Sequence, residues 1–136
     1  MAFQCEHFVA RYEDEAATQA PPVHRMMDMG VSVGEGTYAT RVSSYNPWRS
    51  LYWPITGKSV VGAPSFSESG RIEHLSALGL CRQGSAWFSN EDERKGTLEV
   101  GTFADLAVLS ADYFTIPEDA VKQIESVLTL VGGKVV

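Results

Sequence analysis

The sequence contains little cysteine and fewer basic than acidic residues. Its two cysteines, Cys5 and Cys81, are too few for a disulfide scaffold and too far apart for a C-x-x-C redox or zinc motif, so we interpret both as ordinary thiols. Eleven Lys and Arg residues against seventeen Asp and Glu residues give a formal net charge of −6, and no basic block occurs. Because this charge repels phosphate, it argues against a nucleic-acid partner and against an anionic membrane surface.

Long apolar runs are also lacking. The longest apolar stretches, residues 107–109 and 127–131, fall far short of the roughly 20 residues that a membrane-spanning helix needs. Residues 1–7 include an acid and lack a basic segment before an apolar run, so no secretory signal is expected and the cytoplasm is the default location. A chain of 136 residues with 44% apolar and 21% charged residues is typical of one soluble globular domain.

Local signatures of chemistry are absent from the sequence. His7, His24 and His74 have no His or Cys at the spacing of a metal-binding motif. The nucleophile motif G-x-S-x-G does not occur, because Ser85 lacks the second glycine, and we expect Ser85 to pack within a helix. Two acidic runs are typical of solvated faces rather than of acid/base pairs: residues 13–15 and 91–93.

Two further patterns are weak. Residues 34–39 fit the loose dinucleotide pattern G-x-G-x-x-A, but residues 54–58, where the acid that binds the ribose should stand, contain no carboxylate. We therefore do not expect phosphate binding there. An aromatic cluster could stack a ligand or form core, and its helical spacing favours the core: Tyr45, Trp48, Tyr52 and Trp53.

The first third of the chain predicts a helix followed by a strand. Apolar residues at helical spacing over residues 7–29 predict a helix that Pro21 and Pro22 break into two parts and that Gly30 ends. The alternating residues 31–34 predict a short strand, followed by a small and polar loop. This order is typical of a parallel α/β unit.

Two more helices are expected before residue 90. Asn46 as a cap and Pro47 in the first turn predict a helix start, with interruptions at Pro54 and Gly57. A second helix is expected over residues 71–88. Three apolar residues should share its buried face: Ile72, Leu75 and Leu78.

The last third of the chain is rich in residues that favour strands. We expect strands at residues 97–101, 104–109 and 126–136. Gly132 and Gly133 interrupt the last of these and predict a hairpin with a two-residue turn. The chain is therefore expected to be α/β at first and β at its end.

Several stretches together resemble the carboxyl-terminal part of the metal-dependent amidohydrolase superfamily. The branch is amidohydrolase family 3, which includes N-substituted formamide deformylase-like enzymes, and the stretches are residues 33–48, 84–89, 95–110 and 131–136. The resemblance implies a (β/α)₈ barrel with one or two divalent metals such as zinc, attached to a small β-sandwich. It also implies hydrolysis of amide or similar C–N bonds by metal-activated water.

On this template, residues 1–94 would be the last strand–helix units of an incomplete barrel, with residues 31–34 as its eighth strand. Residues 95–136 would be the carboxyl-terminal part of the β-sandwich. The fold class expected is therefore α/β, a portion of an amidohydrolase barrel plus part of its companion domain. No residue matches the family's H-x-H motif, bridging ligand or later histidines, so no metal or other cofactor is expected in this chain, and a truncated gene is one hypothesis for it.

One functional position of the family is present but changed. Where the resemblance implies the eighth-strand motif G-T-D-A-T-R, residues 36–41 read G-T-Y-A-T-R, so that Tyr38 replaces the Asp that would ligate metal and shuttle a proton. A phenol, with a pKa of about 10, is neutral at pH 7 and supplies neither charge nor basicity. The resemblance also marks Asp105 as a residue that serves a strand turn. It marks candidates for the mouth of the substrate site: Thr37, Arg41, Asn46 and Trp48. A loop-bracing salt bridge is the alternative role for Arg41.

These observations predict an amidohydrolase-like fragment that is catalytically inactive on its own. One alternative is a binding or self-association module, because a barrel fragment exposes strand edges and apolar surface. Another is one half of a split hydrolase that a complementary barrel fragment completes, although Tyr38 weighs against it. Stability should be marginal, since each hydrophobic surface would lack part of its partner.

Overall fold

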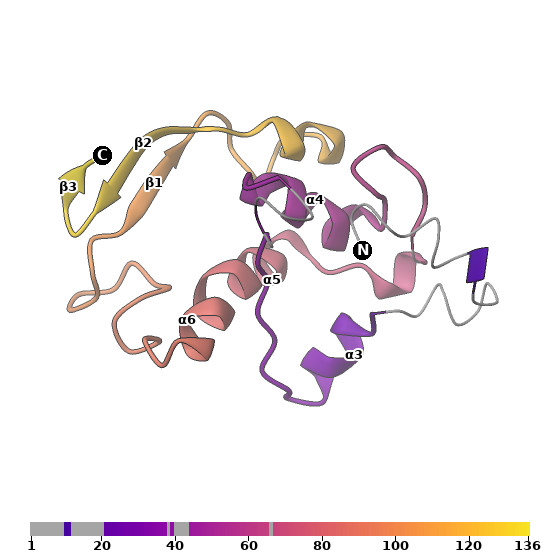
Figure 1. Ribbon diagram of the computed structural model, residues 1–136, viewed down its shortest axis with the longest axis horizontal. Coiled ribbons are helices and arrows are strands. Elements are labelled where there is room, and N and C mark those ends of the chain that lie inside the picture. The colour runs from indigo at the N-terminus through magenta and orange to yellow at the C-terminus, as the bar shows by residue number, and fades with distance from the viewer. Residues whose placement is uncertain (1–9, 12–20, 38, 40–43, 66) are drawn as a thin grey trace.

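The computed structural model describes residues 10–11, 21–37, 39, 44–65 and 67–136. Within these ranges the fold is a mixed α/β domain of four α-helices and a three-stranded antiparallel sheet. The helices lie together and the sheet extends from them to one end of the molecule, where the C-terminus lies (Figure 1). The elements are α3 (Val23–Asp28), α4 (Pro47–Thr56), the 3₁₀ turn η1 (Glu68–Gly70), α5 (His74–Gly79), the π-helical turn η2 (Leu80–Gly84), α6 (Ser85–Phe88), β1 (Leu106–Leu109), the 3₁₀ turn η3 (Glu118–Gln123), β2 (Ser126–Val131) and β3 (Lys134–Val135).

Helix α4 begins as the sequence predicts. The side chain of Asn46 accepts a hydrogen bond from the backbone N–H of Trp48 at 2.9 Å, and Pro47 occupies the first turn. Gly57 ends the helix in the left-handed conformation with φ 67°. The predicted interruption at Pro54 is wrong, because Pro54 lies inside the helix. A proline removes one helical hydrogen bond, and burial of most of this helix outweighs that loss.

The predicted helix over residues 71–88 is confirmed from His74 onward as the continuous run α5, η2 and α6. Its predicted face is only partly right: Leu78 is half-buried against the core, whereas Leu75 is 65% exposed and the fully buried Ala77 was not included. Ile72 is buried but precedes the helix. A helical spacing counted from Ile72 therefore misplaces Leu75, because the helix begins only at His74.

Two predicted strands do not form. Residues 31–34, the expected eighth barrel strand, run without regular structure. Helix α3 ends at Asp28, and Gly30, which was predicted to end it, follows in the left-handed conformation with φ 72°. Residues 97–99 have no regular structure, and Val100 and Gly101 form a turn with Gly101 at φ 104°. A strand needs a neighbour that takes up its backbone hydrogen bonds, and neither segment has a strand beside it among the described residues.

The sheet has the order β1-β2-β3 and confirms the predicted hairpin. Gly132 and Gly133 connect β2 to β3 with φ 57° and 78°, a pair of positive values that suits a two-residue turn. Strand β1 pairs with β2 in antiparallel register, which shifts between Val108 and Leu109. The predicted strand at residues 104–109 is thus confirmed from Leu106 to Leu109.

The core lies between α4, α5 and η3 rather than on the sheet. Its buried members are Trp48, Leu51, Ile55, Ile72, Ala77, Leu80, Tyr113, Val121 and Ile124. Of the aromatic cluster, Trp48 and Tyr52 are buried, which confirms the core interpretation for them, whereas Tyr45 is 80% exposed. The hydroxyl of Tyr52 donates a hydrogen bond to Asp119 at 2.8 Å and so ties α4 to η3. Among the described residues, no helix is both long enough and apolar enough to cross a bilayer.

Candidate functional site

Of the residues that the sequence marks as a substrate mouth, the structure describes Thr37, Asn46 and Trp48. Tyr38 and Arg41 lie outside the described residues. Asn46 uses its side-chain oxygen to cap α4. Trp48 is a core residue whose ring lies 5.6 Å from that of Tyr113, and Thr37 is half-buried. Asn46 and Trp48 therefore have structural roles.

The segment just before Tyr38 packs against the π-helical turn η2 and the start of α6 through three hydrogen bonds, each of which involves Glu35. The backbone N–H of Glu35 donates to the carbonyl of Leu80 at 3.1 Å, and the hydroxyl of Ser85 donates to the carbonyl of Glu35 at 2.8 Å. The thiol of Cys81 donates to Oε2 of Glu35 at 3.6 Å. Ser85 is helical as predicted, and in addition it fixes this segment.

Two glycines allow this close approach. A Cβ atom on Gly84 would overlap the carbonyl oxygen of Val33, and one on Gly34 would lie 2.9 Å from the ring of Phe88. A π-helical turn adds one residue to a helical turn and occurs frequently at functional sites. Here it presents the carbonyl of Leu80 and the thiol of Cys81 to the same neighbouring residue, Glu35.

The half-buried Glu35 and Cys81 have strongly shifted acidities. Burial raises the pKa of the Glu35 carboxyl from 4.5 to about 7, and the hydrogen bond from Cys81 offsets part of this rise. Burial, with the nearby charge of Glu35, raises the pKa of the Cys81 thiol to about 12. Burial also raises the pKa of Tyr113, and the nearby Cys81 and Glu35 add to this rise. Glu35 can therefore exchange a proton near neutral pH, whereas Cys81 stays a thiol and is a poor nucleophile.

Sequence reasoning missed Glu35. It stands between two glycines in a segment expected to be loop, and its partner Cys81 is 46 residues away along the chain. The available signal was a carboxylate directly after an apolar alternating run, where a charged residue has no local partner. That signal alone does not distinguish a buried acid from an exposed one.

An open groove of about 490 Å³ lies beside this segment, between α3 and the run α5–η2. It is lined by Met27, Gly30, Val31, Ser32, Val33, Leu75, Ser76, Gly79, Leu80, Gln83 and Gly84. None of these side chains ionises near neutral pH, so the groove offers contact surface and backbone groups but neither an acid/base group nor a metal ligand.

The described residues do not fit the divalent metal that the resemblance implies. Across the part of the chain that the structure describes, no three His, Cys, Asp or Glu side chains gather where they could hold a metal ion. His24 instead pairs with Asp28 at 3.1 Å on the surface of α3, and the ring of His74 lies 5.1 Å from that of Tyr113. His7 and Cys5 lie outside the described residues.

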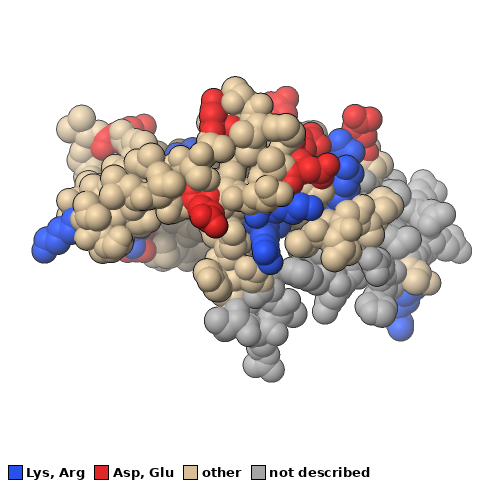
Figure 2. Space-filling view, turned by 90° about the horizontal axis from the view of Figure 1, so that it is seen from above, with Lys and Arg blue, Asp and Glu red and all other residues tan. Residues whose placement is uncertain are grey.

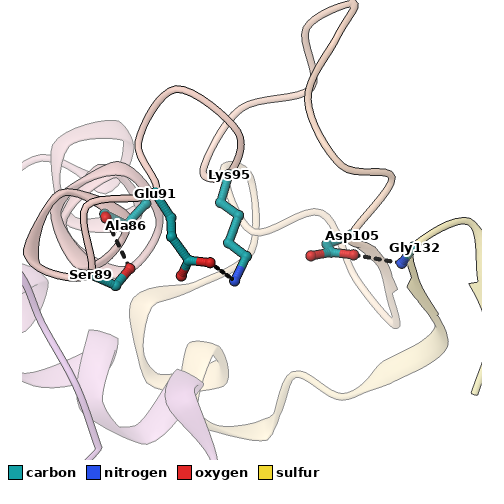
Figure 3. A network of polar contacts seen from close by, with 6 residues as sticks. All are labelled: Ala86, Ser89, Glu91, Lys95, Asp105 and Gly132. Carbon is teal, nitrogen blue, oxygen red and sulfur yellow. Dashed lines mark hydrogen bonds and ion pairs between the residues drawn. The ribbon is translucent and has the colours of Figure 1, made fainter.

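The surface acids make local structural contacts. Glu91 pairs with Lys95 at 2.8 Å, next to the hydrogen bond from Ser89 to the carbonyl of Ala86 (Figure 3). Asp105 accepts a hydrogen bond from the backbone N–H of Gly132, so it serves the hairpin turn. On the face shown in Figure 2, basic and acidic side chains are interspersed, and uncharged side chains cover much of the end that holds the sheet.

Comparison with known proteins gives one match. A family model described as an amidohydrolase family matches residues 1–136, the whole chain. Neither a curated protein nor a solved structure matches.

Proposed function

Because this chain belongs to the amidohydrolase family, we propose that it derives from a metal-dependent hydrolase of C–N bonds. The branch proposed is that of the N-substituted formamide deformylase-like enzymes. In that chemistry a metal-activated water attacks an amide or similar carbon. The proposal includes that these 136 residues, as an isolated chain, do not catalyse the reaction.

The observation that carries the proposal is Tyr38 within the motif of residues 36–41. At this position the family chemistry needs a carboxylate that binds metal and takes a proton from water, and a neutral phenol does neither at pH 7. The nearest carboxylate along the chain, that of Glu35, accepts a hydrogen bond from Cys81 on η2. It is therefore occupied in the packing of its own segment.

The proposed division of the chain assigns residues 1–94 to the last units of the barrel and residues 95–136 to the β-sandwich. The position of the elements supports it, since helices α3 to α6 precede residue 94 and strands β1 to β3 follow it. The side chain of Asp105 on the hairpin turn agrees with the role that the resemblance gives it.

The test is metal content by elemental analysis together with hydrolysis of an N-substituted formamide, measured on the natural chain and on Tyr38→Asp. We expect no stoichiometric zinc and no hydrolysis above the uncatalysed rate from either protein. Stoichiometric zinc, or hydrolysis that a chelator abolishes, would contradict the proposal. In a third arm, a separately made barrel fragment carrying H-x-H is added. Rescue of hydrolysis with the natural chain would establish the split-hydrolase alternative.

A second candidate function is self-association through the sheet. The register places five apolar side chains on one face of the sheet, which we call the apolar sheet face: Leu106, Val108, Leu128, Leu130 and Val135. Val108 is 46% and Val135 is 68% exposed. The outer edge of β1 also has no strand beside it among the described residues. Exposed apolar faces and open edges are the features that favour pairing with a second copy.

A further inference from the structure

The connection between α6 and β1 contains a turn that displays apolar side chains to solvent, which we call the 97–102 turn. Leu98 is 75% exposed and Val100 is fully exposed. The backbone N–H and the hydroxyl of Thr102 both donate hydrogen bonds to the carbonyl of Glu99, at 3.2 Å and 2.8 Å. The turn therefore holds its two apolar side chains in solvent through hydrogen bonds of its own.

Both ends of the 97–102 turn are fixed to the rest of the chain. Before it, Gly96 with φ 89° lies so close to η2 that a Cβ atom there would be 3.0 Å from Cα of Gln83. After it, the backbone N–H of Phe103 donates to the carbonyl of Arg94 at 2.8 Å, and the guanidinium of Arg94 lies 4.3 Å from the centre of the Phe103 ring. Because the turn is anchored in this way, a partner that binds it has little conformational entropy to remove.

The turn and the sheet carry single charges of opposite sign. Glu99 is the only charged side chain in the 97–102 turn, and Lys134 is the only one in β1, β2 and β3. Both are exposed, and neither forms an ion pair with a residue that the structure describes. Lys134 adjoins Val135, which belongs to the apolar sheet face. The two apolar surfaces are therefore complementary in charge.

We propose that the 97–102 turn docks on the apolar sheet face of a second copy of this chain, with Glu99 of one copy beside Lys134 of the other. The proposal rests on the second candidate function, self-association through the sheet, and names the surface that covers the sheet. The connection that holds the turn and the hairpin of β2 and β3 lie at the same end of the molecule (Figure 1). Two copies related by a two-fold axis therefore make the contact twice, and the assembly closes at a dimer.

The contact is assigned to a second copy because the turn does not cover the sheet of its own chain. Val100 is fully exposed, and Val108 and Val135 of the apolar sheet face are 46% and 68% exposed. Burial of the turn against the sheet of another copy removes both apolar surfaces from water, which drives association. The exposed charge pair adds little affinity, but it fixes the orientation, since like charges brought together repel.

The first experiment measures the dimer dissociation constant of charge variants by sedimentation equilibrium. Glu99→Lys and Lys134→Glu each place two like-charged pairs in the dimer, so each variant should have a dissociation constant about tenfold higher than that of the natural chain. Glu93→Lys is the matched control for Glu99→Lys, because it makes the same change of net charge at an exposed acid outside the turn, and it should associate as the natural chain does.

An equimolar mixture of Glu99→Lys and Lys134→Glu identifies the contact as one between copies. In a mixed dimer both contacts again join opposite charges, so the dissociation constant should return to that of the natural chain. If the two side chains met within one copy, mixing would restore nothing. A mixture that associates no better than either variant alone would overturn the proposal.

A second pair of variants tests the apolar part of the contact. Leu98→Ser combined with Val100→Ser removes the apolar side chains of the turn from both contacts and should raise the dissociation constant by about 100-fold. Val61→Ser changes a valine that is 79% exposed outside the turn and the sheet, and it should leave the dissociation constant unchanged.

The outcomes separate this contact from the self-association on which it rests. A natural chain that stays monomeric at every concentration would contradict both. Dimers that persist in the turn variants but are lost when Val108 and Leu128 are both replaced by lysine would overturn the turn contact alone, and the sheet would remain the interface.

Discussion

At the scale of single residues, the free energy of unfolding should depend on the ionisation of Glu35. Its pKa is raised from 4.5 to about 7 on folding. The stability that the neutral carboxyl contributes is therefore fully present below pH 4.5 and is lost as the pH rises through about 7. The loss should approach about 3 kcal/mol, because each pKa unit corresponds to about 1.4 kcal/mol. Urea unfolding at pH 5 and pH 8 measures it.

The control for this prediction is Glu35→Gln, which keeps the shape of the side chain without its charge. The difference in unfolding free energy between pH 5 and pH 8 should shrink in this variant by about the same 3 kcal/mol. A difference as large as in the natural chain would show that other groups cause the pH dependence.

A second residue-scale prediction concerns the glycines of the helical run. Gly84→Ala should destabilise the protein by about 1–3 kcal/mol, because the new methyl group would overlap the carbonyl of Val33. Gly79→Ala is the matched control. A Cβ atom there meets nothing within 4 Å, and alanine favours helix, so the variant should be more stable by about 0.5–1 kcal/mol. Thermal unfolding of both variants measures the contrast, and equal effects would contradict the packing described.

At the scale of elements, the cap of α4 gives the clearest prediction. Asn46→Ala should cost about 1 kcal/mol in the free energy of unfolding, because the N–H of Trp48 loses its acceptor. Asn46→Asp keeps an acceptor at the same place and should retain most of the stability. If Asn46→Asp were as destabilised as Asn46→Ala in denaturant titrations, the amide would have a role other than capping.

The elements that could be predicted from sequence are those with local signals. Asn46 with Pro47 set the start of α4, Gly30 took the left-handed conformation just after α3, and Gly132 with Gly133 formed the hairpin turn. Each of these acts through its own backbone angles or a neighbour two residues away, which the sequence displays directly.

The elements and site residues that could not be predicted depend on distant partners. Residues 31–34 alternate like a strand, but Val33 and Gly34 pack against Gly84 of the π-helical turn, about 50 residues later. The buried acid Glu35 was missed for the same reason, because only the folded chain brings Cys81 to it. Pro54 was predicted to break a helix that the core packing of Leu51 and Ile55 maintains. Tertiary contacts outweigh local propensity in these cases.

At the scale of the whole molecule, the core and the sheet differ in how well they are covered. The buried cluster gathers around α4 and η3, whereas Val108, Leu128 and Val135 of the apolar sheet face are 46%, 39% and 68% exposed. The family model matches the whole chain. Nevertheless, the sheet lacks apolar cover among the described residues. A contiguous exposed apolar surface favours association with a partner, whereas single exposed apolar residues are ordinary in proteins.

The apolar sheet face predicts concentration-dependent association between copies of this chain. In light scattering, the apparent mass should rise toward that of a dimer as the protein concentration increases, since burial of apolar area drives association. The double variant Val108→Lys with Leu128→Lys places two charges on the directly paired positions of β1 and β2 and should stay monomeric. Val61→Lys changes a valine that is 79% exposed outside the sheet and should associate as the natural chain does. A natural chain that stays monomeric at every concentration would rule out this surface as a dimer interface, and association that survives the double variant would place the interface elsewhere.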